Sequence, residues 1–572
     1  MGKPIYRSVR ESFSRDIYMP YCGVVAAPVV MAEITDKGRL DSLEGERPPQ
    51  IAVLHINENL AVTNKEGQEI SKLGSALRKC ARSVPVLYFD SAQTADALSD
   101  FTFENNLADA ILCAPYHQKE LLQNAYLKMP LLRGMLDARG ENLSEKGLPG
   151  LLTKYAATSL IVSSDNANAR FVDYLQKRFI HVVSMDEGGF AAMAALGMNG
   201  VITDNPDGAY EFLSRFPENA FLRKRKLYAH KGFSNDGQYP ENSITSVTAA
   251  GKYHYDGAEI DIKLTKDDVP VVMHNMDTRG LFDCEVMATE QTDYKTLSSL
   301  KRIGFPSESI DRFEDLMHAM KEYEDTPVLI EFKPGSKYNN LEEMIRLAEP
   351  ILRSSDSQKD PIAIMGTLNP GHTFVHRKLP DLPLGFCEGA GTMPEAPRCR
   401  EEAEEFIYRI ARVTAGCAAG YNAQDVKLNR LLNEYAKFRL INVFPWSMSW
   451  TLEPSLWEKN GQENVRDYLS GYDAWTTDHG EKFLSLPVAA EPLGTDGYSM
   501  GECFRPRCRL VYRDGHTEEA DCGMLVLCGN VQKLEDGSCR ADGKAVVMLE
   551  KKLELYFGES YTIYSAPVEI GL

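Results

Sequence analysis

The feature that most constrains the fold is a short pattern that occurs twice, 274 residues apart. Each copy is a β-rich run that ends in Thr-Asp, at Thr203–Asp204 and again at Thr477–Asp478, and each is followed by a Gly and an amphipathic helical stretch. One (β/α)8 barrel uses about 250 residues. The spacing therefore predicts two barrel-sized units in tandem.

Short β-rich runs alternate with helical stretches through both units, which favours parallel strands joined by crossover helices. The last 80 or so residues hold only short strand-like runs bounded by Gly, Asp and Asn, the pattern of a small all-β sandwich. We therefore expect an α/β fold of two TIM barrels. Residues 1–222 form a degenerate, non-catalytic barrel, residues 227–488 a catalytic barrel, and residues 490–572 a β-sandwich accessory domain.

Charge and hydropathy narrow the function classes. The chain has 63 Lys+Arg against 82 Asp+Glu, a net charge of −19, so it repels nucleic-acid backbones at long range. A small phosphate ester held through a divalent cation remains compatible with this charge. No apolar run approaches the roughly 20 residues that span a bilayer, and the N-terminus lacks the apolar core of a secretion signal. We expect a cytoplasmic enzyme with no integral membrane segment.

Charged side chains follow or interrupt successive predicted strands of the second unit. His230 and Lys231 end the first strand, and Glu259 and Asp261 lie two apart in the next. Residues two apart on a strand share one face. Two carboxylates on one face repel each other, so they need a cation or a raised pKa.

Two further strands complete the set. The run VPVVMH ends in His274, and PVLIEFK offers Glu331 and Lys333, again two apart. Three carboxylates suit a hard cation such as Mg²⁺ or Ca²⁺. Two histidines can exchange protons near neutral pH, and lysines can hold a phosphoryl anion. Together these residues predict metal-assisted cleavage of a phosphodiester.

The order of these motifs resembles the glycerophosphodiester phosphodiesterase family. His-(Arg/Lys)-Gly, Pro-Glu-Asn, Glu-x-Asp, Leu-Thr-Lys-Asp, His-(Asp/Asn) and Glu-x-Lys all occur, and the likeness extends from Tyr228 to Pro487. The resemblance implies a (β/α)8 barrel. It also implies hydrolysis of glycerophosphodiesters, the deacylated products of phospholipids, to glycerol 3-phosphate and an alcohol with one divalent cation.

The resemblance also implies roles for individual residues. His230 and His274 match the catalytic pair, and the metal ligands match Glu259, Asp261 and Glu331. Substrate contacts are implied for Lys231, Lys333 and, beside the glycerol group, Trp446; supporting positions are implied for Glu241, Asn242 and Asn275.

Two positions depart from the family pattern. Lys231 stands where an arginine is usual, so the charge is kept but the bidentate fork is lost. Asn275 stands where an aspartate is usual, which removes a negative charge beside His274. The first unit lacks the motifs altogether, which is why we expect it to be degenerate.

Two other functions fit the same residues. One is a sphingomyelinase-D-like or phospholipase-D-like lyase that acts on intact lipids; the other is a binding protein whose barrels do no chemistry. The sequence leaves open the head group, the choice among Mg²⁺, Ca²⁺ and Mn²⁺, and which histidine is the base. It also leaves open a glycan or protein partner for the C-terminal domain.

Overall fold

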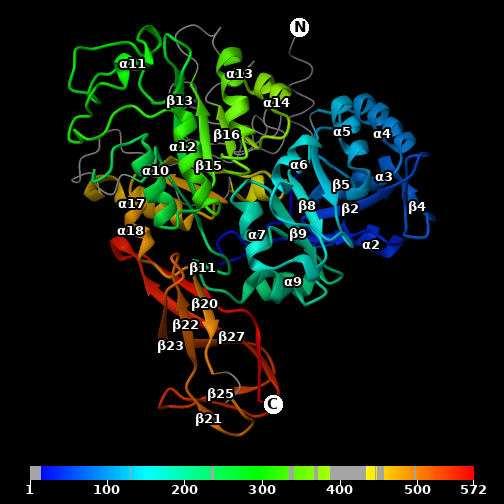
Figure 1. The fold of residues 1–572 in the computed structure, drawn as a ribbon. Coiled ribbons are helices and arrows are strands. Elements are labelled where there is room, and N and C mark those ends of the chain that lie inside the picture. The colour runs from blue at the N-terminus through cyan, green and yellow to red at the C-terminus, as the bar shows by residue number, and fades with distance from the viewer. Residues whose placement is uncertain are drawn as a thin grey trace.

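A computed structural model describes residues 15–130, 132–233, 237–333, 341–365, 371–386, 433–444, 446–447, 457–494 and 498–571. Figure 1 shows two α/β parts side by side, with a β-rich part below them at the C-terminal end of the chain. Among the helices of these ranges, none has both the length and the apolar character needed to cross a bilayer.

The first α/β part is a closed barrel of eight parallel strands. Each strand pairs with its successor, and the ring closes because β10 pairs with β1 with Val29 opposite Gly200. The strands are Val29–Glu33 (β1), Ile51–Ile56 (β2), Val84–Tyr88 (β5), Ile111–Pro115 (β6), Arg133–Asp137 (β7), Ser159–Val162 (β8), His181–Met185 (β9) and Gly200–Ile202 (β10).

Helices cover the outside of this barrel, and two short strands extend it beside β2. The helices are Lys37–Ser42 (α2), Leu73–Lys79 (α3), Ala92–Glu104 (α4), Lys119–Lys128 (α5), Leu148–Lys154 (α6), Ala169–Gln176 (α7), Phe190–Ala195 (α8) and Pro206–Ser214 (α9). The extension consists of the antiparallel strands Ala61–Thr63 (β3) and Glu69–Lys72 (β4).

The second α/β part has seven parallel strands in the order β17-β16-β15-β13-β12-β19-β18, with β14 antiparallel beside β13. Most of the chain between β17 and β18 lies outside the described residues, so closure of a second barrel stays a prediction. The strands are Lys226–Ala229 (β12), Gly257–Leu264 (β13), Pro270–Val272 (β14), Val328–Phe332 (β15), Ile362–Met365 (β16), Leu384–Phe386 (β17), Trp446–Ser447 (β18) and Ala474–Thr477 (β19).

The helices of this part are Ile244–Lys252 (α10), Tyr294–Leu297 (α11), Phe313–Ala319 (α12), Leu341–Leu352 (α13), Gly371–Lys378 (α14), Trp457–Leu469 (α17) and Glu481–Leu484 (α18). The β-rich run FRLINVFPW, residues 438–446, predicts a strand. Within its described residues only Trp446 lies in a strand, while residues 438–440 form a turn.

The C-terminal residues form three small sheets whose strands are antiparallel except for β11. β11 comes from the linker and runs parallel to β28. The strands are Ala220–Phe221 (β11), Ala489–Pro492 (β20), Cys503–Phe504 (β21), Arg507–Val511 (β22), Thr517–Asp521 (β23), Gly523–Cys528 (β24), Val531–Lys533 (β25), Cys539–Ala541 (β26), Ala545–Glu554 (β27), Ser560–Tyr564 (β28) and Val568–Ile570 (β29). The predicted sandwich stays a prediction.

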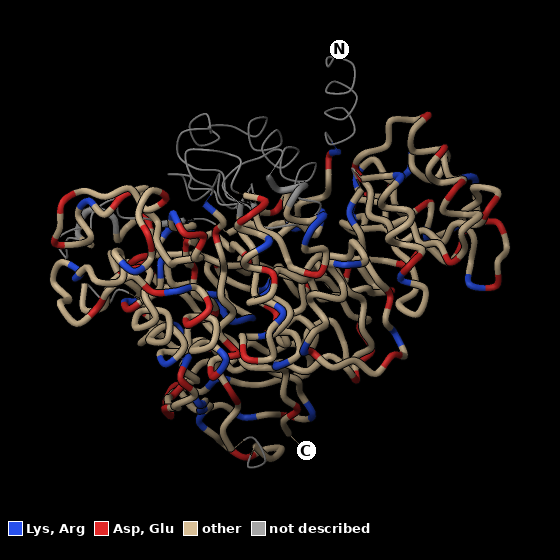
Figure 2. Tube along the Cα trace, turned by 45° about the horizontal axis from the view of Figure 1, so that its top comes forward, with Lys and Arg blue, Asp and Glu red and all other residues tan. Residues whose placement is uncertain are grey.

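Acidic and basic residues are interspersed along the coloured part of the trace in Figure 2. The net charge of −19 is therefore not concentrated in one unit, and local clusters decide how each site behaves.

Each α/β part packs apolar side chains among interior residues at the amino-terminal strand ends of the other part. Side chains from all eight strands of the first barrel form an interior cluster, which Phe438 and Leu440 of the second part join. In the opposite direction, Phe179 of the first part packs among interior residues of the second, where it stacks on Phe444 at 5.0 Å. Both carboxyl-terminal strand ends, where barrels place their chemistry, stay free of this contact.

A buried ion cluster accompanies this packing. The Asp109 carboxylate has no exposed surface and lies 3.1 Å from Arg439 Nε, 3.2 Å from Arg133 Nη2 and 3.3 Å from Arg15 Nε. Burial acts to raise the pKa of Asp109, but the three guanidinium groups outweigh it and the pKa lies below its ordinary value. Asp109 therefore links the two parts, because Arg439 belongs to the second.

We expect Asp109→Asn to lower the free energy of unfolding by about 3–5 kcal/mol, since it leaves buried guanidinium groups without their carboxylate. Urea titrations at neutral pH measure this loss. The contribution of a carboxyl with a lowered pKa is present above its ordinary pKa and is lost as the pH falls, so the variant and the wild type should converge in acid.

Asp96→Asn is the matched control, because Asp96 pairs with Lys128 in an exposed ion pair and should change stability by less than about 1 kcal/mol. Equal losses in the two variants would contradict the structural role of Asp109.

Candidate active site

Strand register brings the acidic residues of the second part together. Asp261 in β13 lies directly opposite Glu331 in β15, and Glu259 lies two residues before Asp261 on the same face. One oxygen of each of the three carboxylates lies within 4.8 Å of the others. All three side chains are buried, with residue exposures of 1%, 1% and 9% for Glu259, Asp261 and Glu331.

The three carboxylates differ in how their charge is balanced. The Lys333 ammonium lies 3.2 Å from Asp261 and 3.1 Å from Glu331. Burial acts to raise the pKa of Asp261, but the charges of Lys333, His274 and Lys231 and the Asn242 hydrogen bond together outweigh it, and the pKa is well below its ordinary value. Burial and the Asp261 charge raise the pKa of Glu259 to about 8, and burial raises that of Glu331. The carboxyl of Glu259 therefore favours its neutral form.

His230 lies directly after β12 and is held by the carboxylate of Asp478, for which the sequence predicts no role at the site. Its Nδ1–H donates to Asp478 Oδ1 at 2.7 Å, since a carboxylate can only accept. The Nε2 atom then lies 4.0 Å from Glu259 Oε2. Burial acts to lower the pKa of His230, but Asp478 outweighs it and the pKa is raised.

His274 reaches the site by a route that differs from the expected one. The sequence suggested a succession of barrel strands, but β14 turns back antiparallel to β13, and β15 pairs directly with β13. The Met273 N–H donates to Asp261 O at 2.8 Å, which brings His274 level with the carboxylates. His274 Nδ1 lies 3.0 Å from Asn275 Oδ1, and burial lowers the pKa of His274.

The Glu241–Asn242 turn supports the carboxylates from the side. Asn242 donates to Asp261 Oδ2 and accepts from the Asp261 N–H, both at 2.9 Å. It directly precedes Ser243, whose capping box starts α10, so the helix start fixes its position. Arg302 donates to the carbonyls of Glu241 and Asn242 at 2.7 and 2.8 Å.

Lys231 is the second cation at the site. Its N–H donates to Glu259 Oε2 at 2.8 Å, and its ammonium lies 3.4 Å from Glu241. The Lys231 backbone is left-handed, with φ of 53°, a conformation that non-glycine residues adopt at a cost and that clusters at functional sites. Lys231 is thus held by the same carboxylates that it helps to neutralise.

Most of the predicted site residues lie close together in the structure. The structure brings together His230, Lys231, Glu241, Asn242, Glu259, Asp261, His274, Asn275, Glu331 and Lys333, while the side chain of Trp446 lies outside the described residues. Asp478 was seen only as part of the Thr-Asp repeat. Lys263 was missed although it shares the inward face of β13, two residues beyond Asp261, and it lies 3.1 Å from Met276 Sδ.

The corresponding end of the first barrel is occupied by a guanidinium group. Arg139 lies 2.7 Å from Glu33 in β1 and 2.7 Å from Asp137 in β7, and Lys65 lies 3.2 Å from Glu33. Burial acts to raise the pKa of Glu33, but Arg139 outweighs it and the pKa is lowered. The two carboxylates at this end are therefore neutralised by the two cations beside them.

The donor set of the second part fits a hard divalent cation. The possible metal ligands that converge there among the described residues are carboxylate oxygens, which is the ligand chemistry that Mg²⁺ and Ca²⁺ prefer. The raised pKa of Glu259 is what two adjacent buried carboxylates show when no cation separates them. Glu259, Asp261 and Glu331 are thus suited to hold one such ion.

One protein-family model matches part of the second unit. Residues 230–452 match the model of the glycerophosphoryl diester phosphodiesterase family, which confirms the resemblance seen in the sequence. An uncharacterized protein of Mycoplasma genitalium is 34% identical over 79 residues, which are 14% of this chain and 30% of that protein. The chain thus spans under a third of that relative's length.

Solved structures similar to this chain include a phosphodiesterase of Oleispira antarctica in complex with the product sn-glycerol-3-phosphate (20% identity, TM-score 0.36). Glycerophosphodiester phosphodiesterases of Parabacteroides distasonis (18%, 0.34) and Thermotoga maritima (20%, 0.32) are also similar. The matches cover 46%, 46% and 45% of this chain and 96%, 95% and 96% of those chains, in that order.

We expect Glu259→Gln to raise the Tm of the metal-free protein in EDTA by about 1–3 °C at pH 9, because a neutral amide removes the repulsion with Asp261. A carboxyl with a raised pKa stabilises the fold below its ordinary pKa, and this contribution is lost as the pH rises through about 8. Wild-type protein should therefore lose more stability between pH 5 and pH 9 than the variant.

Added Mg²⁺, Ca²⁺ or Mn²⁺ should raise the Tm of the wild type but not of Glu259→Gln. Glu314→Gln is the control, since Glu314 is an exposed partner of Arg312. A cation shift that persists unchanged in Glu259→Gln would contradict the metal assignment.

Proposed function

Because residues 230–452 belong to the glycerophosphoryl diester phosphodiesterase family, we propose that this chain hydrolyses glycerophosphodiesters to glycerol 3-phosphate and an alcohol. The observation that carries the proposal is the convergence of three buried carboxylates within 4.8 Å, flanked by two histidines and two lysines. These groups can bind a phosphate diester, neutralise its charge and move protons on both sides of phosphorus.

The metal is proposed to lie among Glu259, Asp261 and Glu331. When bound, it would supply positive charge to the non-bridging phosphate oxygens and so favour nucleophilic attack at phosphorus. Lys231 and Lys333 are proposed to bind the phosphate from the sides. Trp446 is proposed to contact the glycerol group, on the resemblance alone.

The hydrogen-bond partners of the two histidines suggest different roles for them. His230 is paired with the Asp478 carboxylate, which favours an imidazolium. It is proposed to donate a proton to the leaving alcohol oxygen. His274 is paired with the neutral Asn275 amide and is proposed to take the proton of the attacking hydroxyl.

The attacking hydroxyl can be water or the neighbouring glycerol hydroxyl. In the first route the P–O bond to the alcohol breaks as water adds. In the second route a cyclic phosphate forms first, and water then opens it. Forming the ring breaks the P–O bond to the alcohol and uses one round of proton transfer by the histidine pair, and opening the ring with water uses a second round. Accumulation of a cyclic phosphate therefore distinguishes the two routes.

The other parts of the chain enter the proposal as support. Residues 1–222 are proposed to be a non-catalytic barrel, residues 227–488 the catalytic barrel, and residues 490–572 a β-sandwich accessory domain. The charge-balanced cluster around Arg139 at the mouth of the first barrel supports the first assignment, because it leaves no charge deficit for a cation.

We expect the protein to release glycerol 3-phosphate from a panel of glycerophosphocholine, glycerophosphoethanolamine and glycerophosphoglycerol with Mg²⁺, Ca²⁺ or Mn²⁺, and not in EDTA. His230→Ala and His274→Ala should each lower kcat by about 10²–10⁴-fold. Glu259→Gln should abolish the metal-dependent release of glycerol 3-phosphate. His318→Ala is the control, since His318 is an exposed side chain that contacts Asp356 O.

No release from any diester with any metal would contradict the proposal. Turnover of sphingomyelin or lysophospholipids would then favour the lipid lyase. Inactivity on every substrate, together with no cation-induced change in Tm, would favour a binding protein.

We expect Asp478→Asn to lower kcat by about 10–100-fold while leaving KM for the diester nearly unchanged, since Asp478 acts through His230. The carboxylate that raises the pKa of His230 is removed, so the limb of the pH–rate profile that reports the protonated histidine should move to lower pH. Asp204→Asn, at the matching position of the first unit, is the control. A loss of kcat with an unmoved pH profile would contradict the role given to Asp478.

A further inference from the structure

A cavity of about 700 Å³ lies away from the candidate active site, where the three parts of the chain meet. Its walls come from α7 of the first barrel, the linker at residues 221–226, residues 254–255 and 325–326 of the second part, and β-rich segments around Val511. The volume is in the range of small-molecule sites, about 300–1,000 Å³. Because it needs all three parts, this cavity exists only in the assembled chain.

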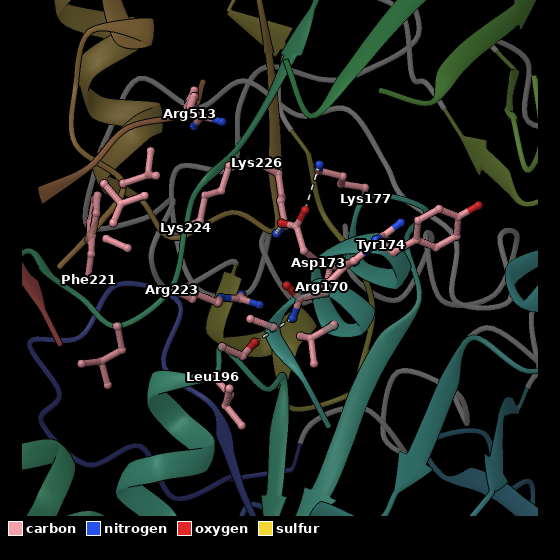
Figure 3. Close-up of a pocket in the computed structure, with 18 of the residues that line it drawn as sticks. Arg170, Asp173, Tyr174, Lys177, Leu196, Phe221, Arg223, Lys224, Lys226 and Arg513 are labelled. Carbon is pink, nitrogen blue, oxygen red and sulfur yellow. Dashed lines mark hydrogen bonds and ion pairs between the residues drawn. The ribbon is translucent and has the colours of Figure 1, made fainter. Parts of the chain in front are cut away.

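Basic side chains dominate the charged walls. Figure 3 shows Lys177 and Lys226 directed at Asp173, with Lys224, Arg223 and Arg513 around the same space. The acidic residues at the walls are Asp173 and the exposed Asp325. In a chain of net charge −19, a local excess of cations is a specific feature and not a reflection of composition.

The carboxylates beneath the walls are each shared by several cations. Asp173 lies 2.8 Å from Lys177 and also contacts Lys226. Asp256 lies 2.7 Å from Lys224 and 3.5 Å from Lys177, and also contacts Arg513. Four cations therefore share two carboxylates. Arg223 is balanced separately by Asp473 at 3.2 Å.

The electrostatic consequence is visible at Lys226, which has 4% of its surface exposed. Burial lowers the pKa of Lys226 to about 8, and the neighbouring Lys224 and Lys177 charges act in the same direction against Asp173 and Asp256. A bound anion would relieve this repulsion. Apolar walls from Phe221, Leu196 and Val172 leave room for a neutral portion of the same ligand.

We infer that this junction cavity binds a small anion bearing phosphate or carboxylate groups, with Lys224 and Lys226 as its principal charged contacts. Ammonium groups bind such anions through charge-assisted hydrogen bonds. The inference does not rest on the proposed phosphodiesterase activity, because none of these lysines contacts the carboxylate cluster at Glu259. Bound anion would join the three parts, so binding should also stabilise the whole chain.

The test is calorimetric titration of the full chain, in EDTA and at constant ionic strength, with inorganic phosphate, pyrophosphate, glycerol 3-phosphate and citrate. We expect at least one of these to bind and to raise the Tm. Lys224→Gln should weaken that binding about tenfold. Lys128→Gln, which removes one exposed charge on the first barrel, should not change it.

Two further variants keep the test decisive. Lys226→Met removes a buried cation and should weaken binding at least as much as Lys224→Gln. If Lys226→Met does not fold, Lys224→Gln alone decides the test, because the Lys224 side chain is 24% exposed and its replacement should leave the fold intact. His230→Ala should retain the binding, which separates this cavity from the candidate active site. Absence of binding up to about 10 mM, or equal affinity in Lys224→Gln and the wild type, would overturn the inference.

Discussion

The reciprocal packing of amino-terminal strand ends is the contact on which the rest of the molecule depends. Phe179 enters the second part and Phe438 and Leu440 enter the interior of the first, so each part supplies apolar groups that the other needs to fill its strand ends. Interiors are packed to crystal-like density, and removal of one partner would open a void in the other. This arrangement leaves both carboxyl-terminal ends available for charged groups.

The two carboxyl-terminal ends then handle the same electrostatic problem in different ways. Buried carboxylates repel each other unless a positive charge lies between them. In the first barrel Arg139 lies between Glu33 and Asp137 and holds the pKa of Glu33 down. In the second part Lys333 balances Asp261 and Glu331, but the pKa of Glu259 stays raised, at about 8. Both carboxylates of the first arrangement are paired with Arg139, whereas Glu259 in the second favours its neutral form.

Much of the candidate site could be predicted, because the period of two along a strand determines which side chains share one face. The i, i+2 spacing of Glu259 with Asp261, and of Glu331 with Lys333, fixes one face whatever the fold. The antiparallel direction of β14 could not be predicted, because an apolar run followed by His274 fits a parallel strand and an antiparallel strand equally well. Asp478 was visible only as a repeated Thr-Asp, because its contact with His230 spans 248 residues. Phe179 carried no sequence signal, as an aromatic residue in a loop is ordinary.

Strand β12 connects the two charged regions of the second part. It begins at Lys226, beside the junction cavity, and His230 follows its last residue. Four residues of extended chain span about 13 Å, too far for direct contact between a ligand in the cavity and the carboxylates. β12 pairs on both sides, with β13 and β19, so it is a rigid spacer. A ligand held at Lys226 therefore stays about one strand length from His230, and the junction cavity and the carboxylate cluster are separate charged regions on one rigid strand.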